Sequence, residues 1–189
     1  MKKIFMILAV AVAMLTSCEK QSDFNKYLTS DYELVKAQYP EQEVVFCEAQ
    51  ATLNGSPSEL GMKAEPVSVR EIFQVIDTAL VVYVDRTYAK DTCVVSEHMG
   101  YWGGDVHVTD LNFVDYKKAL KTLLTVKGEE VPDAVFMTLR EPLGPVAYDN
   151  PFYVFGSNLS SFIAIDARTL DVLEFTLGDG EEEKAETEE

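Results

Sequence analysis

The chain has 189 residues, of which 47% are hydrophobic and 25% are charged, enough for one sizeable core or two small ones. It carries 32 acidic residues against 16 basic ones, a formal net charge of −16 at pH 7. A surface of this sign repels phosphate backbones and anionic lipid headgroups, so we expect no nucleic-acid partner.

The N-terminal residues have the pattern of a secretion signal. Lys2 and Lys3 precede an uncharged apolar stretch over residues 4–15. A membrane-spanning helix needs roughly 20 apolar residues, so this stretch is too short for a transmembrane anchor and fits the core of a signal peptide.

The residues that close this stretch, Leu15-Thr16-Ser17-Cys18, resemble a bacterial lipobox, in which the cysteine is acylated and everything before it is removed. The resemblance implies that residues 1–17 are a lipoprotein signal peptide. It also implies that acyl chains on Cys18 anchor the protein at the outer membrane of the cell envelope, facing either the periplasm or the exterior. An ordinary signal peptide that contains a cysteine is the alternative. Loss of Lys2 and Lys3 lowers the basic count from 16 to 14, so the mature net charge becomes −18.

Two terminal segments of the mature chain are expected to lie outside the folded domain. Residues 18–23 form the tether behind the lipid. Residues 178–189 hold seven acidic residues against Lys184 alone, and such a segment cannot pack, so we expect a disordered acidic tail. We interpret the tail as solubilising; capture of a cation or a partner is the alternative.

The first half of the domain, residues 24–99, is predicted to be a helix followed by strands. A capping-box spacing from Ser30 to Glu33 begins a helix over 31–39, which Pro40 ends. A loop is expected between Asn54 and Pro66. The β-rich segments that we interpret as strands are 43–53, 67–76, 80–84 and 92–95.

The second half, residues 112–177, follows a Trp/Gly connector at 100–111 and has the same predicted order. Its helix over 112–124 carries one apolar face, made of Phe113, Tyr116, Leu120, Leu123 and Leu124. Its predicted strands are 134–139, 152–155, 161–165 and 172–175.

The two halves align as diverged copies. Val44-Val45-Phe46 matches Ala134-Val135-Phe136, and residues 80–87 match residues 161–168. Each copy alone buries little surface, so we expect an α+β fold. In it, two helix-plus-antiparallel-hairpin repeats share one antiparallel sheet, with both helices on one face.

Side-chain directions follow from this interpretation. Leu34 and Val35 of the first helix should face the sheet. Val82 and Val84 should point inward, as Ile163 and Ile165 do in the second copy. The intervening Ala164 should then point outward, so that a lysine there costs far less stability than a charge at Ile163.

One hairpin resembles a known family. Residues 162–173, Phe-Ile-Ala-Ile-Asp-Ala-Arg-Thr-Leu-Asp-Val-Leu, resemble the last hairpin of a PepSY-like domain. The family pattern is an apolar strand and then Asp-Ala-x-Thr-Gly-x-Val, after an aromatic-rich strand, which here is Tyr153-Val154-Phe155. Leu170 departs from the pattern, because the family has Gly there.

The tandem arrangement behind a lipobox is similar to that of the PepSY-like, β-lactamase-inhibitor-like lipoproteins of Bacteroidetes. This resemblance implies a non-catalytic protein that binds or inhibits a protein or peptide partner through a concave sheet. A structural accessory subunit of an outer-membrane or surface assembly is the alternative, and a hydrolase is less favoured.

Cys47 and Cys93 remain once Cys18 carries the lipid. The cell envelope is a compartment in which disulfides persist, and both residues lie in β-like runs. A disulfide across the sheet and two separate buried thiols are therefore both open. Apolar surroundings raise the pKa of a thiol, so neither cysteine is expected to act as a nucleophile.

The sequence contains no catalytic or cofactor motif, and we expect neither an enzyme nor a cofactor. No Gly-x-Ser-x-Gly elbow or phosphate-binding loop occurs. The histidines are His98 and His107, whose spacing fits no zinc motif. A surface metal site that also uses Asp105 and Asp110 is conceivable, but we interpret this segment as a solvated loop.

Three segments are candidates for contacts or modification. Tyr101 and Trp102 stand among glycines, which leaves the indole open to a partner; folding back as a lid on the core is the alternative. Arg140 begins a turn-rich connection that either contacts a partner or simply links two strands. Asp77-Thr78-Ala79 resembles an O-glycosylation site of Bacteroidetes, which makes Thr78 a candidate.

The lipid assignment predicts the behaviour of one variant. Cys18→Ala should accumulate as a precursor that keeps residues 1–17 and takes up no fatty acid, because the acylated thiol is gone. Metabolic labelling with palmitate and N-terminal sequencing measure both properties. Normal labelling of this variant would refute the assignment.

Overall fold

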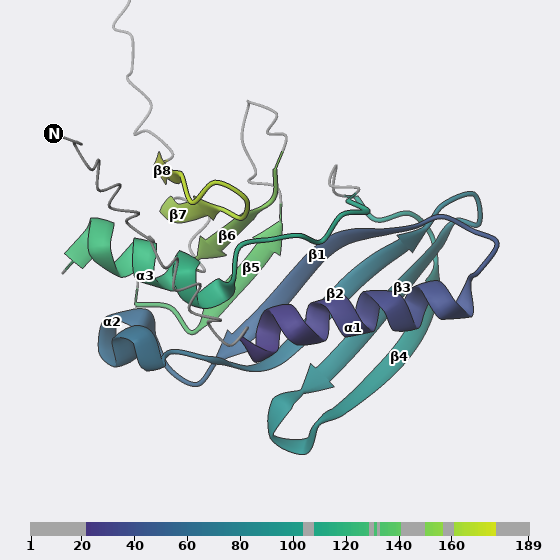
Figure 1. The fold of residues 1–189 in the computed structure, drawn as a ribbon, viewed down its shortest axis with the longest axis horizontal. Helices are drawn as coiled ribbons and strands as arrows, with labels where there is room; N and C mark the ends of the chain where they lie inside the picture. Colours follow the sequence, from purple (N-terminus) through teal and green to yellow (C-terminus); the bar gives the residue numbers. More distant parts are fainter. Residues whose placement is uncertain are drawn as a thin grey trace, which may run out of the picture.

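The computed structural model describes residues 22–103, 108–128, 131, 133–140, 150–156 and 161–176. These residues form an α+β fold with one antiparallel sheet of eight strands, as the sequence predicted at this level (Figure 1). The lipobox with Cys18, Asp105, His107 and the acidic tail lie outside the described residues, as does most of the tether.

The first half begins with a long helix and continues as strands. Helix α1 (Asp23–Gln38) precedes the strands β1 (Val44–Leu53), β2 (Pro66–Val75), β3 (Leu80–Thr87) and β4 (Thr92–Met99). The segment expected to be a loop before Pro66 instead forms α2 (Pro57–Leu60) and the 3-10 turn η1 (Gly61–Lys63). Ser56 caps α2 by accepting a hydrogen bond from the Glu59 amide, and proline is favoured at the first helical position that follows.

The second half also has a helix before four strands, and its strands are shorter. Helix α3 (Tyr116–Lys127) precedes β5 (Phe136–Arg140), β6 (Phe152–Phe155), β7 (Ser161–Asp166) and β8 (Val172–Thr176). The strand order β4-β3-β2-β1-β5-β6-β7-β8 means that two four-stranded meanders join through an antiparallel β1–β5 pair. That pair runs from Ala49 opposite Leu139 to Thr52 opposite Phe136.

Helix α1 begins earlier than the sequence predicted. Its N-cap is Ser22, so the capping box at Ser30 was a wrong assignment, and Asp23 belongs to the helix rather than to the tether. The apolar stripe uses positions 24, 28, 32 and 35, which are Phe24, Leu28, Tyr32 and Val35. Leu34, expected to face the sheet, is 38% exposed.

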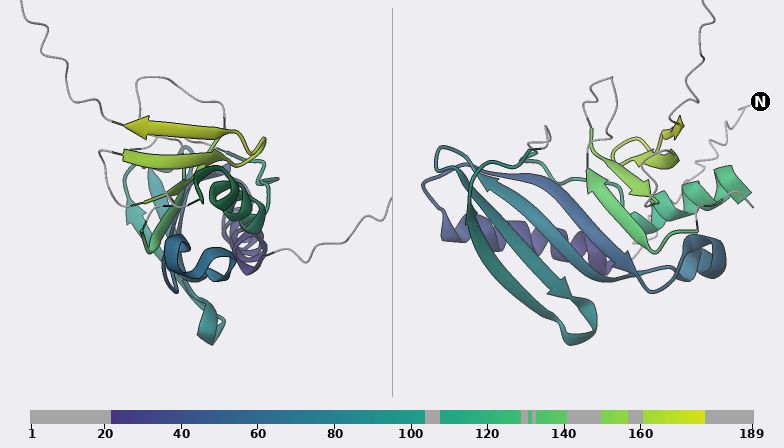
Figure 2. Two further views of the ribbon diagram at one scale, coloured as in Figure 1. Left: turned by 90° about the vertical axis from the view of Figure 1, so that its left-hand side faces the viewer. Right: turned by 180° about the vertical axis from the view of Figure 1, so that it is seen from behind.

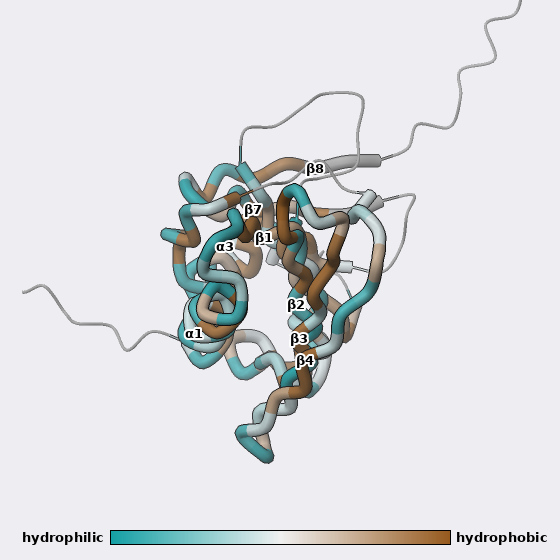
Figure 3. The backbone as a smooth tube through the Cα atoms, turned by 90° about the vertical axis from the view of Figure 1, so that its right-hand side faces the viewer, coloured by the Kyte–Doolittle hydropathy of each residue, from teal (hydrophilic) through white to brown (hydrophobic). Residues whose placement is uncertain are grey.

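Both long helices pack on the same face of the sheet, as predicted (Figure 2). Tyr116, Leu120 and Leu123 of α3 belong to the same hydrophobic core as the stripe of α1. The helix starts at Tyr116 behind the N-cap Asp115, four residues later than expected. Figure 3 shows that the most hydrophobic stretches follow the strands, which supply the other wall of this core.

The predicted side-chain directions in β3 and β7 are correct on both faces, but the expected exposure of Ala164 is wrong. Val82, Val84 and Ile165 are fully buried in the common core, and Ile163 packs against its edge. Ala164 does point to the opposite face, but it is fully buried there beside Phe152 and Val154. A lysine at Ala164 would therefore bury an unpaired charge, and the expectation that it is tolerated was wrong.

The match between Phe46 and Phe136 is wrong in register. Phe46 is fully buried under the helices, whereas Phe136 is 48% exposed on the opposite face. A bulge between Phe46 and Glu48 adds one residue to β1. Side chains alternate between the two faces of the sheet along a strand. One extra residue therefore makes each residue beyond the bulge point to the face opposite the one that simple alternation predicts.

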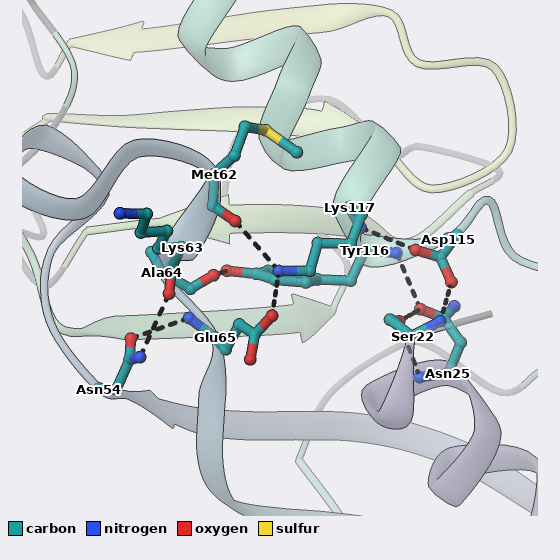
Figure 4. A network of polar contacts seen from close by, with 10 residues as sticks. All are labelled: Ser22, Asn25, Asn54, Met62, Lys63, Ala64, Glu65, Asp115, Tyr116 and Lys117. Atoms are coloured by element: carbon teal, nitrogen blue, oxygen red, sulfur yellow. Dashed lines mark hydrogen bonds and ion pairs between the residues drawn. The ribbon is translucent and has the colours of Figure 1, made fainter. Parts of the chain in front are cut away.

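The N-termini of the two long helices cap each other where the halves meet (Figure 4). Asp115 accepts a hydrogen bond from the Ser22 amide at 2.6 Å, and Asn25 Oδ1 accepts one from the Tyr116 amide at 2.8 Å. The Asn25 amide nitrogen also donates to the Tyr153 hydroxyl at 3.0 Å. Asn25 is 4% exposed, so these contacts form inside the protein, and we call them the helix junction.

The helix junction predicts that Asn25→Ala destabilises the fold by about 2–3 kcal/mol, because the Tyr116 amide is left buried without its partner. Thr29→Ala, one turn later on α1 and exposed, should cost no more than about 0.5 kcal/mol. Urea denaturation followed by circular dichroism gives both values. Equal losses in the two variants would show that the junction adds little stability.

Candidate functional site

The face of the sheet opposite α1 and α3, which we call the outer face, is the candidate site (Figure 2). Side chains alternate along each strand, so every strand that faces the core also presents residues to this face. Two adjoining hollows lie on it, and Gln50 and Arg70 line both.

The first hollow has a volume of about 480 Å³ and lies over β2, β3 and β4. Besides Gln50 and Arg70, it is lined by Ile72, Tyr83, Ser96, His98 and Trp102. The second hollow, of about 550 Å³, extends across β1 to β5. Its lining includes Thr52, Ser68, Asp85, Phe136 and Thr138, and Phe136 contributes an exposed aromatic ring.

Arg70 is held in place where the two hollows meet. Its guanidinium makes two hydrogen bonds to the Asp85 carboxylate across the β2–β3 pair, at 2.8 and 3.0 Å. It also lies over the Tyr83 ring, 5.4 Å from the centroid. Arg70 and Asp85 remain half-exposed, so both keep surface available to a ligand.

Trp102 is positioned by a buried glutamine. The Trp102 amide donates to Gln74 Oε1 at 2.8 Å, and Gln74 is 1% exposed. The indole packs on a small apolar cluster of Val45, Cys47, Ile72 and Val81, so it partly acts as the lid that was the alternative interpretation. This cluster lies on the outer face, away from the main core, and Trp102 still lines the first hollow. The neighbouring Tyr101 is 74% exposed.

Of the residues of the suspected metal loop, the structure describes His98 and Asp110, and these two make separate contacts. His98 is exposed on β4, with its ring 4.9 Å from that of Tyr83. Asp110 instead pairs with Arg168 at 3.2 Å. In the part of the chain that the structure describes, no three His, Cys, Asp or Glu side chains converge on a point that would hold a metal ion.

Cys47 and Cys93 are free thiols on opposite faces of the sheet. Cys47 belongs to the outer-face cluster under Trp102, whereas Cys93 on β4 packs against the main core. The disulfide is therefore not formed, because the sheet separates the two side chains. Burial raises the pKa of the Cys47 thiol to about 12, which keeps it protonated at neutral pH.

Arg140 and Thr78 lie apart from the two hollows. Arg140 ends β5, lines neither hollow, and its buried Nε has no hydrogen-bond partner among the described residues. Thr78 is half-buried in the turn between β2 and β3, and its hydroxyl donates to the Val75 carbonyl at 3.0 Å. Its O-glycosylation stays a prediction.

A buried charged cluster under α1 was not recognised in the sequence. Asp31, at 1% exposed, accepts hydrogen bonds from Nε and Nη2 of Arg86, which reaches it from β3. Glu71 of β2 is fully buried beside this pair, and neither of its carboxyl oxygens has a hydrogen-bond partner among the described residues. Burial first, and then the charge of Asp31, raises the pKa of Glu71 well above its usual range.

The outer-face residues that sequence reasoning missed are Gln50, Arg70, Tyr83 and Asp85. A signal for them was present: a hairpin turn at 76–79 places Val75 opposite Leu80, and counting outward from there pairs Arg70 with Asp85. Pairing residues in this way requires the exact length of the turn. The positive φ angles of Asp77 and Ala79 set that length, but an aspartate and an alanine at these positions do not reveal it in the sequence.

Comparison of the chain with protein-family models, with curated proteins and with solved structures found no match. None of the described helices combines the length and the apolar character that crossing a membrane requires.

The Glu71 environment predicts a pH-dependent stability difference. In the unfolded chain Glu71 ionises above a pKa of about 4.3, whereas in the folded protein it stays protonated to higher pH. The stability that this group contributes is therefore present at low pH and is lost as the pH rises. Near pH 4, Glu71→Gln should have the same free energy of unfolding as the native protein. As the pH rises, the variant should become more stable than the native protein by up to about 1.4 kcal/mol for each pH unit. This increase should stop once the pH passes the pKa of Glu71 in the folded protein.

Urea denaturation at several pH values measures this difference, with Glu59→Gln in the exposed helix α2 as the matched control. The control should show no such trend. A constant difference between Glu71→Gln and the native protein from pH 4 to pH 8 would mean that Glu71 is ionised in the folded state.

Proposed function

We propose that the protein is lipid-anchored in the cell envelope and that its PepSY-like domain binds a protein or peptide partner on the outer face, without catalysis. The observation that carries the proposal is the group Arg70, Tyr83 and Trp102 around the first hollow. Arginine, tyrosine and tryptophan are the residue types that most often dominate binding energy at protein interfaces.

The same residues are preorganised. Asp85 fixes the guanidinium of Arg70, and Gln74 fixes the backbone of Trp102. A side chain that is already held loses less conformational entropy when a partner binds, so more of the contact energy appears as affinity. Gln50 and Ser96 add hydrogen-bonding groups beside the aromatic rings.

The order of elements supports a tandem PepSY-like arrangement. Each half is a helix followed by a four-stranded antiparallel meander. The turn before β8 has Leu170 at φ 68°, the left-handed conformation that glycine adopts most readily, at the position where the family has glycine. Asp166 stabilises this turn by accepting hydrogen bonds from the amides of Arg168 and Thr169.

The lipid anchor restricts where a partner can be met. Since α1 begins at Asp23, only residues 19–22 separate the proposed lipidated Cys18 from the helix. A chain reaches at most about 3.5 Å per residue, so such a tether holds the start of α1 within about 20 Å of the anchor. The partner is therefore itself a membrane or envelope component.

Affinity purification tests this function. A tagged protein purified from detergent-solubilised membranes of its own cells should retain one partner in near-stoichiometric amount. Tyr83→Ala should reduce that amount about ten-fold or more, because the ring supports Arg70 and lines the first hollow. Leu34→Ala, on the exposed side of α1, is the matched control and should retain the partner. Equal recovery with both variants would rule out the outer face as the binding surface.

A further inference from the structure

Strand β4 forms one edge of the sheet, beside the first hollow. It pairs with β3 without interruption from Thr92 opposite Thr87 to Met99 opposite Leu80. In Figure 1 the β3–β4 hairpin lies at one border of the sheet with no labelled element beside β4. The other edge, β8, has five residues, against eight in β4.

The backbone groups of this edge that point away from β3, and that bond to no described residue, can be assigned from the ladder. The Gly100 amide donates to the Ala79 carbonyl at 2.6 Å, so these two residues form a hydrogen-bonded pair. Hydrogen-bonded pairs alternate along an antiparallel ladder, so every second residue of β4 bonds to β3. The residues between them direct their N–H and C=O groups away from the sheet: Cys93, Val95, Glu97 and Met99.

Strand β4 has one acidic side chain, Glu97, and otherwise lacks the features that usually protect an edge. Proteins block such edges with proline, lysine or a bulge, and β4 contains none of these. Large apolar side chains are instead exposed on the strand or just after it in the sequence. Their exposed fractions are 65% for Val94, 81% for Met99 and 74% for Tyr101. An unprotected edge with exposed apolar side chains is a template for another strand.

The charge of the protein selects the occupant. A second mature copy would bring another net charge of −18 to the same edge (14 basic against 32 acidic residues), which opposes pairing of identical chains, whereas a basic segment is attracted. Glu97 lies along β4 and accepts a hydrogen bond from Tyr39. Asp91 lies at the end of β4 and pairs with Arg86. Both carboxylates are exposed, so a basic residue of an added strand can reach them. Alternate side chains of that strand would fall beside His98 and Ser96, which line the first hollow.

We propose that β4 binds an extended, positively charged peptide segment of the partner protein, which adds to the sheet as a further strand. The inference rests on the proposed function and specifies its partner. Backbone hydrogen bonds supply affinity along β4, and the first hollow selects the side chains of the added strand.

The test measures binding of a fluorescein-labelled peptide of eight alternating lysine and valine residues to the full chain in detergent, by fluorescence anisotropy. Glu97→Pro removes one outward N–H of β4, whereas Glu97→Gln removes the same charge and keeps the N–H. Because proline is tolerated where a strand N–H faces away from the sheet, both variants should fold, as circular dichroism will show. Met99→Pro and Met99→Ala form a second pair. Both remove the methionine side chain, but only the proline variant removes the outward N–H. The proline variants should bind about ten-fold or more weakly than their controls.

Three altered peptides complete the experiment. The two sets of alternate backbone nitrogens are methylated in two separate peptides, and methylation of the set that faces β4 should abolish binding. Replacement of lysine by glutamate should also abolish it. Equal binding by Glu97→Pro and Glu97→Gln, or binding that survives in both methylated peptides, would overturn the proposal. A dimer that analytical ultracentrifugation detects, and that Glu97→Pro dissociates, would also overturn the proposal, because a second copy would then occupy the edge. If the envelope partner is still lost in Tyr83→Ala after such a result, the proposed function stands and only the edge is excluded.

Discussion

The mutual capping of two helix N-termini is the contact on which the arrangement depends. Strands β1 and β5 join the halves through only four residue pairs, which is a short ladder to hold two meanders in one sheet. Asn25 and Asp115 reinforce it from the helix side, because each satisfies an amide at the start of the other helix. Tyr153, which accepts a hydrogen bond from Asn25, brings β6 into the same contact. Both helices are thereby fixed over one continuous core.

This arrangement leaves the two faces of the sheet with different roles. The helix-covered face holds the large core and the buried Asp31–Arg86 pair, with Glu71 beside it. The outer face has two smaller apolar clusters, and between them lie polar and aromatic side chains held by their neighbours. Because the core needs neither Arg70 nor Tyr83, these residues are available for recognition. Preorganisation by Asp85 and Gln74 comes from the strands themselves, so it persists without a ligand.

The sequence predicted the element order, the single antiparallel sheet and the common face of the helices, because apolar periodicity reports burial directly. It misplaced the start of α1, since the cap at Ser22 lacks the glutamate of a capping box, although Phe24 and Leu28 already continued the stripe. It could not predict the bulge after Phe46. Because of this bulge, Phe46 and its proposed counterpart Phe136 lie on opposite faces of the sheet. The pair of Arg70 with Asp85 requires exact strand register, and local pattern does not supply it. Of the residues proposed to contact a partner, Trp102 lines a hollow on the outer face, whereas Tyr101 and Arg140 line neither hollow.

The central claim is that the outer face, rather than the helix-covered side, meets the partner. Site-specific photo-crosslinking in the native cells tests it directly, with a benzophenone amino acid placed at Tyr83 on the outer face or at Leu34 on the exposed side of α1. If the partner binds the outer face, position 83 should give one discrete cross-linked product and position 34 should give none. A product from position 34 alone, or none from either position, would contradict it.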